Sequence, residues 1–234
     1  ADPRGLRIGL LDTHPTGGAL HDDCIAAVRH AAQLLETIGH DVSHGHPEAL
    51  EDRDAGRRFA AVWATMMGVN IATLSNMLGR EVIADDVEAV NWAQAEYARH
   101  LSAVDYATGL AATGRYRRRM QQWWADGWDL LLTPTLAAPP LPIGDLYADR
   151  TDGIEADNPL RPSIRAGHWV AFTPQFNTTG QPAISLPLHW NDEGLPVGVQ
   201  LVAAYGREDV LIAVASQLEQ AAPWADHHPP MPVS

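Results

Sequence analysis

RGLRIGLL, at residues 4–11, is a short apolar segment that is followed directly by the turn-forming residues DTHPTGG, at 12–18. A short apolar run bounded by turn residues is typical of a β-strand. Four apolar residues then recur at the spacing of a helix: Ile25, Val28, Ala32 and Leu35. Gly39 ends this helix, and HDVSH, at 40–44, follows as a second strand. Strand, helix and strand form the unit of parallel sheets, so this segment predicts an α/β fold.

The middle of the chain has the composition of a helical region. Residues 51–127 hold no proline and are rich in helix formers, so they predict a helical subregion of about three helices. Four glycines are the candidate joints between these helices: Gly68, Gly79, Gly109 and Gly114. A long surface loop is expected over 139–165, where five prolines and several acidic residues gather.

Three further strands and a last helix complete the pattern. WDLLLTPT, at 128–135, predicts a buried strand. Residues 183–187 and 197–203 predict two strands around the turn NDEG, at 191–194. Apolar residues on one face predict a helix over 207–220. Layers of helix and sheet follow from this order of elements.

Composition excludes several classes of protein. With 46% apolar and 19% charged residues among 234, the chain can bury a sizeable core. The 16 basic and 29 acidic residues give a net charge of −13, so neither nucleic acid nor a membrane is expected as a partner. All 16 basic residues are arginine, so this chain cannot use any catalytic mechanism that needs a lysine. Cys24 is the one cysteine and has no disulfide partner, which favours a cytoplasmic location.

Few clusters of reactive side chains stand out. Three histidines and a glutamate lie close together: His40, His44, His46 and Glu48. They could hold a metal, but their spacing is not that of known metal sites, and a solvated turn explains them better. Ser185 could meet His168 or His189, yet a serine with apolar neighbours on a strand is more often a packing residue. The residues themselves therefore predict no catalytic centre, no metal and no cofactor.

Several long segments carry a family resemblance. FTPQFNTTGQPAISLP, at 172–187, and GLPVGVQLVAAYGREDVLIAVASQLE, at 194–219, closely resemble the carboxy-terminal signature of the amidase signature family. WDLLLTPTLAAP, at 128–139, is similar to that family's strand before its Thr-Pro-Thr corner, and RGLRIGLL to the strand that opens its second half. The pieces AAYGRED and PW look nearest to the branch of cyclic amide and nylon-oligomer hydrolases. The resemblance implies one amidase-like domain over 1–234, a partial mixed sheet flanked by helices that forms the carboxy-terminal portion of the family's α/β/α fold.

The same resemblance implies a function. Enzymes of this family hydrolyse amides with a Ser, cis-Ser, Lys triad. Those residues lie in the family's amino-terminal half, before the part that this chain resembles, and the absence of lysine agrees. We therefore expect a portion of an amide-bond (C–N) hydrolase that supplies the wall of the substrate funnel and is inactive alone. Its expected partners are a small amide substrate and the missing amino-terminal half, or a second copy, because a severed sheet exposes an edge.

Two other functions stay open at this point. A degenerate amidase could have kept the pocket wall as a non-catalytic binding or regulatory module. A metal-dependent hydrolase could use the segment 40–48. An upstream reading frame that encodes lysine and a Gly-Gly-Ser-Ser-Gly-like stretch would favour the hydrolase portion, whereas stoichiometric zinc would favour the metal enzyme.

The residues expected to contact substrate come from this resemblance and from their place in the fold. Thr133 and Thr135 lie at a strand end, where α/β sheets present ligands, although core packing or turn capping explains them equally well. The turn NTTGQP, at 177–182, would form a pocket floor or simply fix two strands, with Gly180 at positive φ and Asn177 tying adjacent backbone groups. A tryptophan on the first long helix is a further candidate, with simple packing as the alternative. The substrate-binding candidates are Thr133, Thr135, Asn177, Gly180, Gln181 and Trp63.

Overall fold

The structure is a computed structural model that describes residues 3–147 and 157–228, and the contacts between residues divide the chain into two units. Unit 1 comprises residues 1–50, 120–140 and 170–234, and unit 2 comprises residues 51–119 and 141–169. Residues 120–127, which composition groups with the helical region, thus belong to unit 1.

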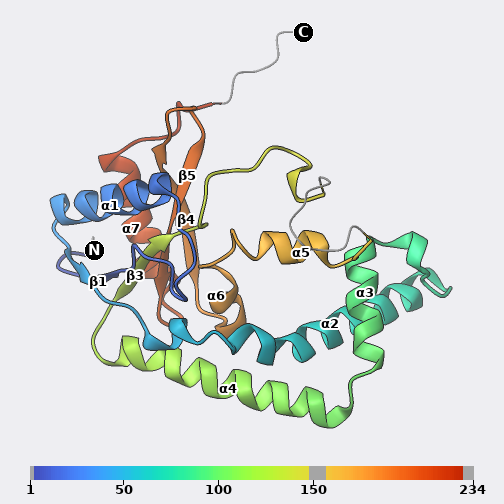
Figure 1. The fold of residues 1–234 in the computed structure, drawn as a ribbon. Helices are drawn as coiled ribbons and strands as arrows, with labels where there is room; N and C mark the ends of the chain where they lie inside the picture. Colours follow the sequence, from blue (N-terminus) through green and yellow to red (C-terminus); the bar gives the residue numbers. More distant parts are fainter. Residues whose placement is uncertain (1–2, 148–156, 229–234) are drawn as a thin grey trace, which may run out of the picture. The chain divides into compact units, whose positions relative to one another are not determined.

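A five-stranded mixed sheet forms the centre of unit 1 (Figure 1). Its strands are β1 (Arg7–Leu10), β2 (Asp41–His44), β3 (Leu130–Pro134), β4 (Ala183–Trp190) and β5 (Pro196–Ala203). They lie in the order β2-β1-β3-β5-β4. β1 is parallel to β2 and β3, whereas β5 is antiparallel to β3 and β4. The predicted strand–helix–strand unit and the predicted pair of strands around NDEG are confirmed.

One face of this sheet carries the apolar core of unit 1. The helices α1 (Asp22–Thr37) and α7 (Glu208–Ala221) pack on that face. Leu130 and Leu132 of β3 and Leu201 of β5 meet them there and are fully buried. Burial contributes about 1.5–3 kcal/mol for each such leucine. Because strand side chains alternate between faces, the residues between these leucines point to the opposite side of the sheet.

β4 is longer than the sequence predicted. The predicted strand ends at Pro187, but pairing with β5 continues to Trp190 after a register irregularity between Leu186 and His189. β4 lies at the edge of the sheet, where a residue without an N–H is tolerated. The proline therefore accompanies a bulge and does not end the strand.

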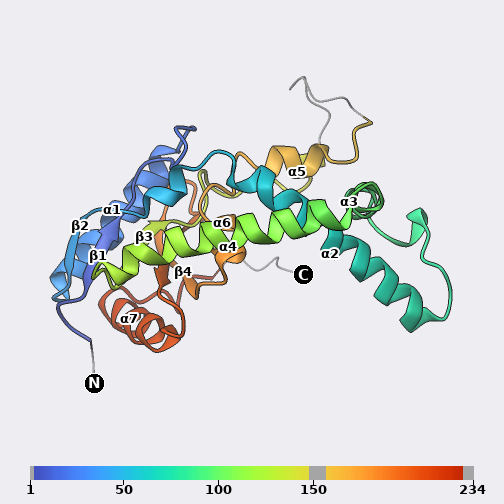
Figure 2. The ribbon, with the colours of Figure 1, turned by 90° about the horizontal axis from the view of Figure 1, so that it is seen from below.

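Helices make up unit 2. They are α2 (Ala55–Leu78), α3 (Ala89–Arg99), α4 (Ala103–Ala125) and α5 (Arg161–Ala166), with the 3-10 turns η2 (Ala84–Asp86) and η3 (Asp145–Tyr147) between them. A further 3-10 turn, η1 (Glu48–Glu51), precedes α2 and lies mostly in unit 1. α4 runs as one unbroken helix (Figure 2) and contributes its residues from Met120 onward to unit 1. Among the described residues, no helix combines the length and the apolar character that crossing a membrane requires.

Three of the four predicted glycine joints are wrong. Gly79 does end α2, at φ +66°, in the left-handed conformation that glycine adopts readily. Gly68 lies inside α2, and Gly109 and Gly114 lie inside α4. At Gly109 a Cβ would lie 3.0 Å from Val62 Cγ2, so the missing side chain lets α4 approach α2 instead of breaking the helix.

The loop predicted over 139–165 is partly wrong. Residues 145–147 form η3, and α5 begins at residue 161, while residues 148–156 lie outside the described part of the chain. Pro162 occupies the first turn of α5, where a proline has no intrahelical hydrogen bond to lose. Proline is therefore a poor sign of a loop at this position.

Candidate functional site

A row of polar side chains crosses the face of the sheet opposite α1 and α7. Thr133 on β3, Gln200 on β5 and Ser185 on β4 are neighbours in the strand register, and these three residues form the polar row. The row interrupts strands that are otherwise apolar, as in GVQLVA at 198–203. Alternation along each strand places the three side chains on one face.

Gln200 lies buried at the centre of the polar row. It is 4% exposed, and its Nε2 donates to Thr133 Oγ1 at 3.1 Å and to the Phe172 carbonyl at 3.0 Å. Thr133 is fully buried, and its hydroxyl donates to the Pro134 carbonyl at 2.7 Å. These hydrogen bonds hold β3, β5 and the segment around Phe172 in one geometry. Thr133 therefore serves the scaffold of the site.

A pair of hydroxyls lies at the end of the polar row. Thr135 Oγ1 and Ser185 Oγ are 2.6 Å apart. Gly198 leaves room for them, since a Cβ there would lie 2.8 Å from Ser185 Oγ and 3.0 Å from Thr135 Oγ1. The hydroxyl pair lines a cavity of about 210 Å³, whose other walls include Cys24 and Val197. Two hydroxyls among apolar walls can hold a small polar group by hydrogen bonds.

The thiol of Cys24 supplies surface to this cavity and not a nucleophile. Cys24 is 1% exposed on α1. Burial, together with the neighbouring charge of Asp23, raises the pKa of the Cys24 thiol to about 11. Because the thiolate is the reactive form, the neutral thiol is inert at pH 7.

His14 belongs to this edge of the sheet, although the sequence pattern did not single it out. It follows β1, and the parallel strands β1 and β3 end at the same edge as Thr135. The rings of His14 and Phe172 have centroids 6.2 Å apart, and His14 Nδ1 accepts from the Thr16 N–H at 3.2 Å. Burial lowers the pKa of His14, so its imidazole is neutral at pH 7. The position of His14 in the turn directly after a predicted strand is the sequence feature that could have identified it.

The first half of the predicted turn over 177–182 is helical. α6 (Pro174–Thr179) includes Asn177, whose side chain is exposed, and its tie to adjacent backbone stays a prediction. Proline in the first turn and a glycine after the last are the usual limits of a short helix. Gly180 does adopt a positive φ, +75°, as the left-handed residue that ends α6.

Gln181 joins the end of α6 to the sheet. Its Nε2 donates to the Ala203 carbonyl at 3.0 Å, and its Oε1 accepts from Thr179 Oγ1 at 3.1 Å. Gln181 is 7% exposed, so its hydrogen bonds go to protein groups. A contact of Gln181 with substrate stays a prediction, and its place in the structure is that of an anchor.

Trp63 lies on α2 within unit 2. Its Nε1 donates to Gln94 Oε1 on α3 at 2.8 Å, and its ring lies 6.2 Å from that of Phe59, centroid to centroid. The side chain is 47% exposed. Trp63 thus links two helices and keeps ring surface available for a further contact.

The histidine-rich segment does not converge on one point. His40 is buried, and its Nε2 lies 3.1 Å from Gln217 Oε1. His44 instead places Nε2 3.3 Å from Asp12 Oδ1, a carboxylate that Arg29 also binds at 2.8 Å. Within residues 3–147 and 157–228, no group of three or more His, Cys, Asp or Glu side chains has a metal-binding arrangement. The structure therefore gives the metal-dependent hydrolase no support.

The hydroxyl pair can bind a polar group, but it does not activate a nucleophile. Ser185 is hydrogen-bonded to Thr135. An activated serine needs a base within hydrogen-bond reach, and a threonine is not a base at neutral pH. The geometry suits contact with a substrate amide, whose N–H and carbonyl can bond to hydroxyls.

Residues 1–212 match the Amidase family along nine-tenths of the chain. The chain belongs to the Amidase family. The resemblance carried by residues 128–139, 172–187 and 194–219 is thereby confirmed.

Curated members of the Amidase family extend well beyond this chain. The 6-aminohexanoate-cyclic-dimer hydrolases of Pseudomonas sp. strain NK87 and Paenarthrobacter ureafaciens are each 38% identical over 231 residues, which are 97% of this chain and 46% of the relative. The putative amidase AmiC of Mycobacterium tuberculosis H37Rv is 34% identical over 205 residues, which are 85% of this chain and 40% of the relative. This Amidase-family chain thus spans a little under half the length of the curated relatives it matches.

Solved structures of Amidase-family enzymes share the fold. A 6-aminohexanoate cyclic dimer hydrolase matches with a TM-score of 0.88 at 38% identity, over 98% of this chain and 48% of that enzyme. A 6-aminohexanoate cyclic dimer hydrolase complexed with substrate matches with a TM-score of 0.85 at 37% identity, over 98% of this chain and 48% of that enzyme. A bacterial aryl acylamidase of the amidase signature family, 21% identical, matches in fold with a TM-score of 0.72 over 96% of this chain and 45% of that enzyme. The predicted fold, a mixed sheet flanked by helices, is confirmed.

Proposed function

We propose that this chain is a portion of an amide-bond hydrolase that forms the wall of the substrate funnel, with the catalytic serines and lysine on another segment. One observation carries the proposal: 97% of the chain aligns with a 6-aminohexanoate-cyclic-dimer hydrolase, but the match covers 46% of that enzyme. The chain also has no lysine, although the triad of this family uses one.

The uncovered surface of unit 2 supports the presence of a partner. The buried residues of α2 are Val62 and Ala64, out of 24 in the helix. Apolar side chains on the same helix stay open to solvent, among them Met66 at 46%, Leu78 at 52% and Met77 at 79% exposure. An apolar helix that buries so little is typical of a surface that another segment covers. We propose that the amino-terminal half of the enzyme, or a second copy, covers it.

The proposed substrate is a small cyclic or linear amide. Two of the relatives named above act on the 6-aminohexanoate cyclic dimer, according to their names, and one solved relative holds its substrate. Of the candidate residues, Thr135 has the geometry of a direct contact, because its hydroxyl lines the cavity with Ser185. Asn177 and Trp63 are exposed and could contact substrate, whereas the remaining three position backbone around the site: Thr133, Gly180 and Gln181.

The test compares this chain with the product of its reading frame extended upstream. The purified chain and the product of the reading frame extended upstream receive the 6-aminohexanoate cyclic dimer and simple aryl amides, and released amine is measured. We expect no release above blank from the chain and clear turnover from the longer protein. Turnover by the chain alone would overturn the proposal. A longer protein that binds the amides without cleaving them would support the non-catalytic module.

A cytoplasmic location is part of this proposal. Cys24 is a free thiol buried against the sheet, as suits a reducing compartment. Cell fractionation with an antibody against the chain tests this location, and recovery in a secreted fraction would contradict it.

A further inference from the structure

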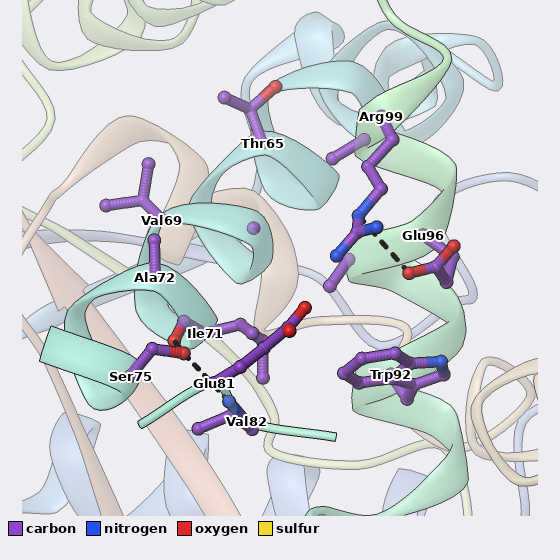
Figure 3. A pocket seen from close by; sticks show the side chains of 13 residues that line it. Thr65, Val69, Ile71, Ala72, Ser75, Glu81, Val82, Trp92, Glu96 and Arg99 are labelled. Carbon is purple, nitrogen blue, oxygen red and sulfur yellow. Dashed lines mark hydrogen bonds and ion pairs between the residues drawn. The ribbon is translucent and has the colours of Figure 1, made fainter. Parts of the chain in front are cut away.

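A cleft of about 430 Å³ opens between α2 and α3 in unit 2 (Figure 3). Its walls are chiefly apolar, and Figure 3 shows Val69 and Ala72 on the α2 side and Trp92 on the α3 side. Two carboxylates and a guanidinium share this space: Glu81, Glu96 and Arg99. The candidate residues for amide binding in unit 1 take no part in this cleft.

The floor of the cleft is held in place by the fold. Val82 is 1% exposed there, and its N–H donates to Ser75 Oγ at 3.0 Å. The same hydroxyl donates to the Ile71 carbonyl at 3.0 Å, which ties the floor to α2. A Cβ at Gly68 would lie 3.4 Å from Ala98 Cβ, so α2 and α3 are in close contact at that point. A cleft with a fixed floor needs little reorganisation to bind a ligand.

The charges around the cleft leave one carboxylate uncompensated. Arg99 Nε pairs with Glu96 Oε1 at 3.3 Å. Glu81 extends from the chain after α2 into the space between the two helices (Figure 3). Among the described residues, Glu81 has no ion pair. Its neighbour Arg80 is held elsewhere, because its two terminal nitrogens bind the Asp86 carboxylate at 2.7 and 2.8 Å. The groups that face the cleft therefore sum to one negative charge.

We propose that this cleft binds a short alkylammonium ion. The ammonium group would lie between the Glu81 carboxylate and the Trp92 ring, since carboxylates pair with ammonium and an aromatic face attracts a cation. The alkyl chain would lie along Val69 and Ala72, where it leaves water. An alkyl carboxylate of the same length is repelled by Glu81, and an alcohol of the same length lacks the charge. This inference stands whether or not the amide hydrolase proposed above is correct.

Calorimetric titration of the purified chain with hexylammonium, hexan-1-ol and hexanoate tests the proposal. We expect hexylammonium to bind with a Kd of about 1 mM, the alcohol about tenfold more weakly and hexanoate not at all. Binding of hexylammonium should weaken with added salt, because one partly exposed charge pair contributes. Equal binding of hexylammonium and hexanoate would overturn the proposal, as would no binding of hexylammonium.

Three variants place the site. We expect Glu81→Gln to weaken hexylammonium binding about tenfold and Ala72→Leu, which fills the cleft, to abolish it. Glu193→Gln removes the same charge from the turn between β4 and β5 in unit 1 and should leave binding unchanged. Because all three positions are exposed, we expect each variant to fold, and circular dichroism checks this. Equal losses of hexylammonium affinity in Glu81→Gln and Glu193→Gln would show that only the net charge of the chain matters, and would overturn the proposed site.

Discussion

α1 in unit 1 buries six of its 16 residues against the sheet, whereas α2 in unit 2 buries two of its 24. Both helices are rich in alanine and in larger apolar residues, so composition does not separate them. The apolar stripe of α1 lies on a sheet face that carries leucines from β1 and β3. α2 instead contacts α3, which buries Ala95 alone among its 11 residues.

This difference in burial indicates which unit contributes most of the chain's stability. Stability in small domains comes chiefly from apolar area removed from water, and unit 1 has a contiguous core of that kind. Unit 2 depends on helix propensity and on arginine–carboxylate pairs such as Arg80–Asp86 and Arg119–Asp52, which contribute little individually. We therefore expect unit 2 to open more readily than unit 1.

A matched pair of leucine truncations gives the largest expected effect. Leu201→Ala removes a fully buried side chain from β5, and we expect it to lower the free energy of unfolding by about 3 kcal/mol. Leu78→Ala removes the same atoms from the end of α2, where the side chain is 52% exposed, and should cost less than about 0.5 kcal/mol. Urea unfolding followed by circular dichroism measures both. Similar losses in the free energy of unfolding for both variants would contradict the expected difference between the two units.

Thiol labelling sharpens the comparison by measuring local opening. Cys24 reports on unit 1, and Ala64→Cys, combined with Cys24→Ala, places a thiol at a buried position of α2 that is 3% exposed. We expect the α2 thiol to react about 10–100 times faster at pH 8, because opening of unit 2 costs less.

The pH dependence of labelling carries a second check. The pKa of the folded Cys24 thiol, about 11, lies above its unfolded value, so its contribution to stability is present below the unfolded pKa and is lost as pH rises toward 11. Labelling of Cys24 should therefore accelerate more than tenfold between pH 8 and pH 10. Equal rates for both thiols at pH 8 would contradict the lower stability of unit 2.

Two glycine-to-alanine substitutions should have opposite signs. Gly198→Ala brings a Cβ within 3.0 Å of both hydroxyls of the Thr135–Ser185 pair, and we expect a loss of about 1–3 kcal/mol. Gly114→Ala lies inside α4, where the nearest atom to a new Cβ is 3.8 Å away, and should stabilise the chain by about 1 kcal/mol. Thermal unfolding measures both, and destabilisation by Gly114→Ala would show that α4 is more tightly packed than its contacts indicate.

The smallest effect is expected at Asp52 in unit 2. The Arg58 hydrogen bond, helped by Arg119, holds the pKa of Asp52 below its ordinary value. A lowered folded pKa means that the stabilisation is present above the unfolded carboxyl pKa and is lost as pH falls through the folded pKa. Asp52→Asn should therefore lower Tm slightly at pH 7 and less at pH 3. A larger difference in Tm at pH 3 than at pH 7 would contradict this assignment.

Much of the fold could be predicted from local patterns, and the exceptions have physical reasons. Apolar residues and the turn residues beside them identified β1 and β5, and a continuous run of leucines closed by Pro134 identified β3 as a buried strand, because these patterns depend on neighbouring residues alone. The low helix propensity of glycine predicts a joint at Gly109, but propensity does not record that Val62 of another helix fills the space a side chain would need. Pro162 and Pro187 suggested a loop and a strand end, whereas a first helical turn and a sheet edge tolerate proline.

For the candidate site, the sequence identified individual residues but not the network that connects them. Thr133 and Thr135 follow from their position at a strand end. Gln200 did not stand out as one polar residue in an apolar strand. Its role depends on hydrogen bonds to Phe172, 28 residues away, and to Thr133, 67 residues away. His14 reaches the same edge because β1 and β3 lie side by side.

The amino-acid sequence alone determined the family of this chain, the α/β order of its elements and the absence of lysine. These properties depend on residue identity and on periodicities of two to four residues, which any stretch of chain displays by itself. Tertiary structure alone decided that Thr135 and Ser185 share a hydrogen bond, that Gln181 anchors α6 to β5, and that Glu81 and Trp92 face one cleft. Such pairings depend on strand order and helix packing, which bring distant residues together through the burial of apolar surface across the whole unit.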